Sequence, residues 1–309
     1  MKIVFMGTSE FAVPALQALF DAHEVLAVVT QPDRPKGRGN KMAVSPVKDA
    51  ALQRDVPILQ PLRVKRKEAM AELAAFGADI FVVASYGQIL SETILHMPKY
   101  GCINIHASIL PKYRGASPIQ QAILHGDAIA GVTIQQMDKG VDTGDILMIR
   151  ETPITNDDTG GSLHDKLAAL GAEAILAVLP MIADGTVTRV KQNDAEASHA
   201  PLLTKDMGRI NWSQPPQAIV NLVRGLNPWP CAFMLYENQP IRILAATVQE
   251  GFSPALPGTI CEASPKNGLV IAAADGLVRV VTVQAPNGKR MAAADYLRGH
   301  EMAVGAVLG

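Results

Sequence analysis

Two polar residues interrupt a segment that otherwise has the composition of a buried β-strand. Residues 102–108 read CINIHAS, and Asn104 and His106 occupy positions where a core strand would carry valine. Successive side chains of a strand point to opposite faces, so residues two apart share a face. The amide and the imidazole are therefore predicted to lie side by side. Such a pair can also be a satisfied polar pair at a strand end, so it does not establish a site by itself.

A glycine-rich segment about thirty residues further along supplies carboxylates. Residues 137–147 read MDKGVDTGDIL and place Asp138, Asp142 and Asp145 at the end of another predicted strand. Aspartates in such loops bond their own backbone and form turns, which is the ordinary role for each of them alone. Combined with the amide and the imidazole, a carboxylate would complete a polar cluster at one edge of a sheet.

Three chemistries use such a cluster, and the sequence favours one of them. Ser-His-Asp hydrolysis needs a serine on a sharp turn, such as G-x-S-x-G, and the sequence lacks that motif. Metal-dependent hydrolysis needs more ligands at suitable spacing. Acyl transfer to an amine needs only donors directed at a developing oxyanion and a group that manages the amine proton. Asn104 would be the neutral donor and His106 the charged one, with Asp142 holding the imidazole and favouring its protonated form.

The elements that would position this cluster alternate along the first half of the chain. Apolar strands are predicted at 2–7, 25–31, 79–85, 102–108, 131–137 and 145–150. Helices are predicted at 11–22, 46–54, 67–76, 118–126 and 162–183, the second and fourth of them beginning with a Ser-Pro capping signal. Apolar strands separated by helices are typical of a mostly parallel sheet covered on both faces. We therefore expect a doubly wound α/β domain that binds ligands beyond the carboxyl ends of its strands.

The pattern changes after residue 190. Residues 191–201 are polar and predict a linker, and a short helix is predicted to run from the Pro-Pro pair at 215–216 to about residue 224. Short strand-like runs separated by Gly/Asn turns follow at 232–237, 241–248, 258–263, 268–274 and 277–283. This pattern favours a small closed barrel, with an OB-like barrel preferred. The predicted boundaries are a catalytic domain at 1–189, a linker at 190–206 and a carboxyl-terminal barrel at 207–309.

Composition narrows the class of protein. A chain of 309 residues favours two domains. The cysteines at 102, 231 and 261 form neither a zinc spacing nor a disulfide framework, which suits a reducing compartment. No secretory signal is apparent, and no uninterrupted run reaches the ~18 apolar residues of a membrane span. We expect a cytoplasmic protein that binds no structural metal and no membrane.

Charge is distributed unevenly, although the net charge is −1. Residues 31–67 hold ten Lys/Arg against three Asp/Glu, whereas residues 68–204 hold eight against sixteen. A basic segment of this kind attracts a polyanion, but it is equally compatible with a solvated charged loop.

Several motifs together resemble the formyltetrahydrofolate-dependent formyltransferases. They are NIHASILP at 104–111, YRGASPIQ at 113–120, MDKGVDTGD at 137–145, GTSEFA at 7–12, TQPDRPKGRG at 30–39 and NPWP at 227–230. The likeness extends to the barrel-like tail and so covers essentially the whole chain. It implies a Rossmann-like formyltransferase domain joined by a linker to an OB-like domain. It also implies that Asn104, His106 and Asp142 are the catalytic set.

The resemblance further implies the substrates and their contacts. The segment Ser108, Ile109, Leu110 and Pro111 corresponds to the family's folate-binding S-L-L-P, and Tyr86, Gly87, Gln88 and Ile89 are expected to line the same pteridine pocket. Arg38 would contact the tRNA acceptor stem, with Lys205 as a further tRNA contact. The implied reaction transfers a formyl group from 10-formyltetrahydrofolate to the α-amino group of methionine on initiator methionyl-tRNA. We expect the protein to be a monomer.

Alternative acceptors are the amines of a ribonucleotide or a sugar-nucleotide. Glycinamide ribonucleotide formyltransferases are usually single domains, so the tail and the basic segment argue against that acceptor. Sugar-nucleotide formyltransferases can carry a comparable tail, and the long cationic segment PDRPKGRGNKM at 32–42 argues against them. A non-catalytic RNA- or nucleotide-binding module is the alternative from another class. The presence of all three residues of the cluster argues against a module without activity.

Overall fold

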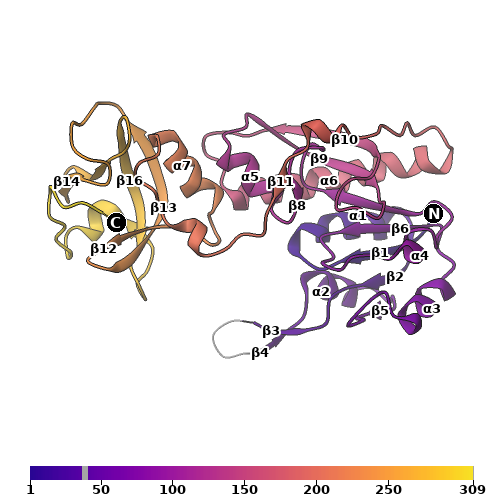
Figure 1. The fold of residues 1–309 in the computed structure, drawn as a ribbon. Helices are drawn as coiled ribbons and strands as arrows, with labels where there is room; N and C mark the ends of the chain where they lie inside the picture. Colours follow the sequence, from indigo (N-terminus) through magenta and orange to yellow (C-terminus); the bar gives the residue numbers. More distant parts are fainter. Residues whose placement is uncertain (37–40, 309) are drawn as a thin grey trace. The chain divides into compact units, whose positions relative to one another are not determined.

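A mostly parallel sheet organises the first of two compact units into which the chain divides (Figure 1). The computed structural model describes residues 1–36 and 41–308. The first unit comprises the described residues of 1–118, 129–153 and 164–200. The second comprises those of 119–128, 154–163 and 201–308.

The sheet of the first unit has seven strands within the described part of the chain. They are β1 (Lys2–Gly7), β2 (Glu24–Val29), β5 (Ile58–Leu59), β6 (Ile80–Ala84), β7 (Cys102–His106), β9 (Ile129–Gln136) and β10 (Ile146–Pro153). Their order is β10-β9-β7-β6-β1-β2-β5. The strands β7, β6, β1, β2 and β5 run parallel, whereas β9 is antiparallel to both β7 and β10. The prediction of a mostly parallel α/β sheet is confirmed.

The predicted helices of this unit begin within two residues of their expected starts, whereas the short helix at Glu92–Leu95 was not predicted. The helices are α1 (Val13–Ala22), α2 (Pro46–Leu52), α3 (Lys67–Ala75), α4 (Glu92–Leu95) and most of α6 (Gly160–Ala183). Helix α2 shows how the Ser-Pro signal starts a helix. The Ser45 hydroxyl caps the helix by accepting a 3.0 Å hydrogen bond from the Lys48 amide, and Pro46 occupies the first turn.

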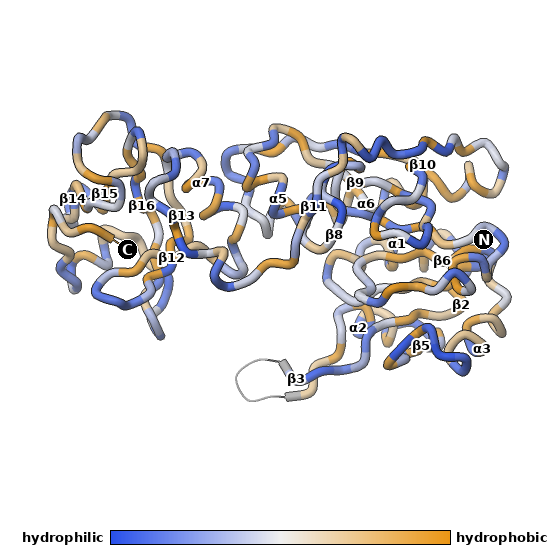
Figure 2. The backbone as a smooth tube through the Cα atoms, viewed as in Figure 1, coloured by the Kyte–Doolittle hydropathy of each residue, from blue (hydrophilic) through white to orange (hydrophobic). Residues whose placement is uncertain are grey.

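Apolar strands place the core on both faces of the sheet, and the central strands carry hydrophobic colours in Figure 2. On one face, Val4, Met6 and Val83 pack with Leu73 of α3 and Ile94 of α4. On β7, Ile103 and Ile105 alternate with Asn104 and His106, so the apolar pair occupies the opposite face from the polar pair. Helix α6 approaches β7 closely at Gly171, where an added Cβ would lie 2.9 Å from Ile105 Cγ2.

Two short strand pairs were not predicted from the sequence. The strands β3 (Arg34–Lys36) and β4 (Lys41–Ala43) are antiparallel and flank the four residues that are not described. The strands β8 (Arg114–Gly115) and β11 (His199–Ala200) are parallel. Residues 191–200 of the predicted linker belong to the first unit, and His199–Ala200 pair with the backbone of β8.

Helix α6 is long and apolar enough to cross a membrane by length and composition alone, with a mean hydropathy of 1.8 over its most apolar window. Charged residues interrupt its apolar stretch, which is why a search for uninterrupted runs does not find it. A core helix of a soluble protein passes the same test, and 44% of that window is buried inside the structure. The absence of a membrane partner stays a prediction.

The second unit contains a sheet of antiparallel strands. They are β12 (Ala232–Tyr236), β13 (Gln239–Gln249), β14 (Ile260–Ser264), β15 (Gly268–Ala272), β16 (Leu277–Gln284) and β17 (Met291–Ala292). Their order is β12-β13-β16-β15-β14, with β17 paired to β16. The helices α7 (Pro216–Gly225) and α8 (Ala293–Tyr296) share one core with this sheet. The predicted run of short strands is therefore present as a domain of antiparallel strands.

Two segments that lie within the predicted catalytic domain, residues 1–189, belong to this second unit. One contains most of α5 (Pro118–Leu124), and the other spans 154–163. The segment 154–163 is held to the second unit by Arg224 of α7. The Nη1 of this residue donates to the carbonyls of Thr155, Asn156 and Asp158 at 2.8–3.1 Å. The predicted boundaries at 189 and 206 treat each domain as continuous, and they stay a prediction.

Candidate active site

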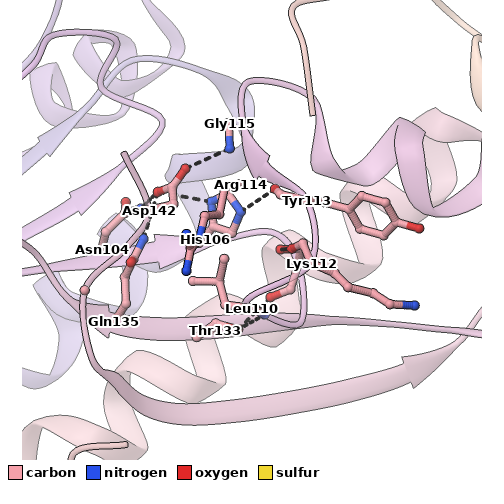
Figure 3. Close-up of polar contacts among 12 residues, drawn as sticks. Asn104, His106, Leu110, Lys112, Tyr113, Arg114, Gly115, Thr133, Gln135 and Asp142 are labelled. Carbon is pink, nitrogen blue, oxygen red and sulfur yellow. Dashed lines mark hydrogen bonds and ion pairs between the residues drawn. The ribbon is translucent and has the colours of Figure 1, made fainter. Parts of the chain in front are cut away.

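Asn104 and His106 lie near the carboxyl end of β7, and Asp142 approaches them from the loop that joins β9 to β10 (Figure 3). The Asn104 Nδ2 donates to Asp142 Oδ1 at 3.3 Å. His106 Nδ1 lies 3.5 Å from the same oxygen. The structure thus brings the three predicted catalytic residues together, with two nitrogens directed at one carboxylate oxygen.

Asp142 is held by more donors than these two. Gln135 Nε2 donates to Oδ1 at 2.8 Å, and the Gly115 amide donates to Oδ2 at 2.9 Å. The residue has a φ of 54°, a left-handed conformation that costs a non-glycine residue free energy. Since 14% of the side chain is exposed, these donors replace most of the water that a carboxylate would otherwise bind.

His106 has an acceptor near each ring nitrogen. Its Nε2 lies 3.0 Å from the Tyr113 carbonyl oxygen, and its Nδ1 faces Asp142. A carbonyl and a carboxylate oxygen can only accept, so the doubly protonated ring is the form that places hydrogen atoms toward both. The ring is buried, with 6% of its side chain exposed. The contacts therefore suit a charged donor paired with a carboxylate.

The carboxylates at positions 138 and 145 do not join this cluster in the contacts of the described residues. Asp138 Oδ1 accepts hydrogen bonds from the Gly140 amide at 2.9 Å and from Thr143 Oγ1 at 2.7 Å. Asp138 is thus the turn-forming aspartate that its loop predicted.

The predicted folate segment 108–111 forms a turn that is bound to β9. Thr133 Oγ1 donates to the Ser108 carbonyl at 2.6 Å and accepts from the Leu110 amide at 3.1 Å. The Ser108 hydroxyl donates to the Lys112 carbonyl at 2.6 Å, and the Leu110 side chain is buried. Ile109 and Pro111 are partly exposed. The polar groups of the segment thus maintain the turn, and its folate contact stays a prediction.

The second predicted folate segment, 86–89, contains residues with very different surroundings. Tyr86 is a core residue with 2% exposure, and burial raises the pKa of its phenol. Gln88 Oε1 accepts a hydrogen bond from the Val64 backbone amide at 2.8 Å, and its Nε2 donates to the Pro61 carbonyl at 2.9 Å. The side chain therefore holds the neighbouring loop in place. Ile89, by contrast, is 78% exposed. Ile89 is therefore the side chain of this segment that is most accessible to a ligand.

A cavity of about 660 Å³ lies beyond the carboxyl ends of β1, β2 and β6. Its lining includes residues that follow each of these strands, residues of β3 and β4, and His164 in the first turns of α6. Tyr86 and Gly87 contribute to it. The cavity occupies the sheet edge at which the predicted fold binds its ligands.

The contacts of the described residues do not test the two predicted tRNA contacts. Arg38 lies outside the described residues. Lys205 is an exposed residue of the second unit, immediately before a short 3-10 helix at Asp206–Gly208. Both assignments stay predictions.

Sequence reasoning missed the groups that hold the catalytic residues. Gln135 of β9 lies directly opposite Asn104 in the β7–β9 register, so strand pairing could have identified it. The Tyr113 carbonyl and the Gly115 amide are backbone groups, for which no residue type provides a signal. Among the described residues, no group of three or more His, Cys, Asp or Glu side chains could hold a metal ion.

Comparison with known proteins agrees with this geometry. The formyl transferase family model matches residues 1–179, and that of the formyl transferase carboxyl-terminal domain matches residues 202–301. The chain is 46% identical over 310 residues to a methionyl-tRNA formyltransferase of Caldanaerobacter subterraneus subsp. tengcongensis, covering all of both chains. It is 46% identical over 312 residues to that of Pseudomonas savastanoi pv. phaseolicola, covering all of this chain and 98% of the relative.

A solved structure shows the same fold at greater distance. The sugar 3N-formyl transferase WlaRD, crystallised with dTDP and 5-N-formyl-THF, has a TM-score of 0.67 and 22% sequence identity. The match covers 91% of this chain and 97% of that one. From the identity and coverage of the closer relatives, the chain belongs to the methionyl-tRNA formyltransferase family of formyl transferases.

Proposed function

We propose that the protein transfers the formyl group of 10-formyltetrahydrofolate to the α-amino group of methionine on initiator methionyl-tRNA, for translation initiation. The observation that carries this proposal is the Asn104–His106–Asp142 cluster, in a chain 46% identical over its whole length to methionyl-tRNA formyltransferases. A ribonucleotide or a sugar-nucleotide amine is the alternative acceptor, and no contact among the described residues favours it.

In the proposed reaction the methionine amine attacks the formyl carbon directly. A bond forms between the amine nitrogen and that carbon, and the carbonyl oxygen gains negative charge. Asn104 and His106 both direct a nitrogen toward Asp142 Oδ1, so an oxyanion next to that oxygen can receive hydrogen bonds from both donors. The bond from the formyl carbon to N10 then breaks. N10 gains one proton and the amine loses one, with the Asp142 carboxylate in position to take up the amine proton.

We place the folate ring on the loops that flank β7. The loop after β6 carries Ile89, and the loop after β9 carries Val141, which is 62% exposed. Exposed aliphatic side chains on two loops around a polar cluster provide apolar surface for a planar ring. The turn at 108–111, which follows β7 itself, would form the floor between them. The folate is a co-substrate, and no step of this reaction requires a metal.

The aminoacyl end of the tRNA would use the cavity beyond β1, β2 and β6. Its lining includes Arg34, Pro35, Ala43 and Val44, which belong to or adjoin the strands that flank Arg38. A nucleic acid that contacts the basic segment would therefore have its terminus near this cavity. We further propose that the carboxyl-terminal sheet forms an OB-like barrel that contacts the tRNA, that Lys205 takes part, and that the protein acts as a cytoplasmic monomer.

Mass analysis of methionyl-tRNA tests the function directly. After incubation with the protein and 10-formyltetrahydrofolate, the aminoacyl-tRNA should gain the mass of one formyl group. Parallel reactions should contain glycinamide ribonucleotide or a dTDP-linked amino sugar in place of the tRNA. Formylation of either small acceptor without formylation of methionyl-tRNA would contradict the proposal.

Replacing Arg38 with alanine is expected to lower kcat/KM for methionyl-tRNA about 10-fold, because a charged hydrogen bond to phosphate is lost. The dependence of log kcat/KM on log salt concentration should become shallower by about one unit, since one fewer phosphate is neutralised. The KM for the folate should not change. Formylation rates across a salt series provide the measurement.

The matched control is Lys65→Ala, which removes another cation of the same basic segment. Lys65 is exposed and is not expected to contact the acceptor stem. Salt screens the attraction between its charge and distant phosphates, so Lys65→Ala should change kcat/KM only slightly. Equal and small losses for the two variants would contradict a special role of Arg38.

A further inference from the structure

Gln192 is not among the predicted site residues, yet its side chain forms hydrogen bonds with the backbone of the loop that carries Asp142. We call this loop, between β9 and β10, the catalytic loop. Its Nε2 donates to the Asp142 carbonyl at 2.9 Å and to the Gly144 carbonyl at 2.7 Å. These carbonyls belong to the left-handed residue of the cluster and to the glycine two positions later. Gln192 comes from the polar segment that follows α6, fifty residues along the chain.

The other end of the same amide faces Arg114. Both Nε and Nη2 of Arg114 donate to Gln192 Oε1, at 3.0 and 2.8 Å, and Nη2 also pairs with Asp194 at 2.7 Å. A guanidinium can only donate and a carbonyl can only accept, so the amide of Gln192 has one allowed orientation. The side chain of Arg114 is 7% exposed, so its cation depends on these partners.

The residues on either side of Arg114 contact the catalytic residues through their backbone. The Tyr113 carbonyl lies against His106, and the Gly115 amide donates to Asp142 Oδ2. Gln192 therefore connects the two segments that surround the cluster. Its Oε1 binds Arg114 of the 113–115 segment, and its Nε2 binds the backbone of the catalytic loop. A left-handed backbone persists only where its surroundings determine it, and Gln192 contributes two of the bonds that do so.

We propose that Gln192 is a positioning residue for the formyl transfer, acting through Asp142. It fixes the backbone of Asp142, so that the carboxylate stays between Asn104, His106 and the Gly115 amide. The inference rests on the proposed function, because it requires a reaction in which the placement of Asp142 matters. Reactivity is sensitive to small misplacements of catalytic groups, so the loss of these bonds should lower turnover.

The variant that isolates this role is Gln192→Glu. The carboxylate has the same shape and keeps the contact with the Arg114 guanidinium, but it offers only acceptors to the two loop carbonyls. We expect kcat to fall about 10- to 100-fold. The KM for the folate should stay within about twofold and the thermal midpoint close to wild type. If Gln192→Glu does not fold, Gln192→Ala replaces it and is read by the same criteria.

Gln284→Glu is a matched control in the second unit. Gln284 has the same pattern of contacts, since its Oε1 accepts from Arg242 and its Nε2 donates to the Gly288 carbonyl. Because that sheet is proposed to contact the tRNA, the control is measured at saturating methionyl-tRNA, where the single-turnover rate should stay within twofold of wild type.

The deciding measurement combines Gln192→Glu with Asp142→Asn. Residues that act as a unit give non-additive losses, so the second change should cost nothing further in the Asp142→Asn background. A kcat within twofold of wild type for the single variant would overturn the proposal. The same fold-loss in both backgrounds would overturn it too, because Gln192 would then act independently of Asp142. Wild-type protein that fails to formylate methionyl-tRNA would instead contradict the proposed function.

Discussion

Replacing Asp142 with asparagine is expected to lower kcat for formylation by about 10³-fold while the chain stays folded. The carboxylate and the His106 imidazole are both buried, with 14% and 6% of their side chains exposed. Proton transfer by a positioned side chain contributes about 10²–10⁴-fold to a rate, and Asp142 is the group placed to take up the amine proton. A barrier raised by ~4 kcal/mol corresponds to a rate about 10³-fold lower.

The hydrogen-bond pattern makes asparagine a demanding substitution. Oδ1 receives donors from Gln135 and Asn104 and faces His106, whereas Oδ2 receives the Gly115 amide. Every group around the carboxylate is a donor, so an NH₂ group at either position would face a donor. The backbone, however, should keep its conformation, because asparagine tolerates the left-handed region at φ 54°.

Single-turnover formylation at saturating folate measures the loss, with circular dichroism to confirm folding. Asp138→Asn is the matched control, since asparagine can form the same turn with the Gly140 amide and Thr143. That variant should stay within about threefold of wild type. An Asp142→Asn protein that is folded and retains more than a tenth of wild-type kcat would contradict the role given to the carboxylate.

Local patterns in the sequence predicted the parts of the site that depend on side-chain periodicity. Asn104 and His106 share a face because β-strands alternate, and they lie near a strand end because the apolar run stops there. The Ser45 cap is local in the same sense, since its partner is the Lys48 amide three residues away. An apolar run does not reveal direction, so the antiparallel placement of β9 required the structure.

The groups that hold the cluster in place could not be predicted in this way. The Tyr113 carbonyl and the Gly115 amide are present whatever the residue type, and β8 and β11 are two residues long each. The segment that contains Gln192 was predicted as a linker because it is polar. Its polar groups in fact bond the catalytic loop and Arg114. Composition does not distinguish a solvated linker from one whose polar groups are bonded to the protein.

Replacing Asn104 with alanine is expected to lower kcat by about 10²–10³-fold, because one donor to the oxyanion is lost. The amide also donates to Asp142 Oδ1, so a second explanation for such a loss is that Asp142 moves. This bond is long, at 3.3 Å, and Asp142 keeps Gln135 and Gly115 as donors when it is removed. The KM for the folate should therefore remain within about threefold.

Gln135→Met separates the two explanations. Gln135 bonds the same Oδ1 at the shorter distance of 2.8 Å, and methionine has a similar shape without the donor. The change also removes Gln135 Oε1, a buried acceptor without a partner in the described part of the chain, so the fold should tolerate it. If Asn104 served only to hold Asp142, then Gln135→Met would cost at least as much activity. We expect less than about a 10-fold loss of kcat for Gln135→Met, because Gln135 supports the carboxylate while Asn104 donates to the reacting oxygen. Equal losses for the two variants, measured in parallel under single-turnover conditions, would show that the Asn104 amide acts on Asp142 and not on the oxyanion.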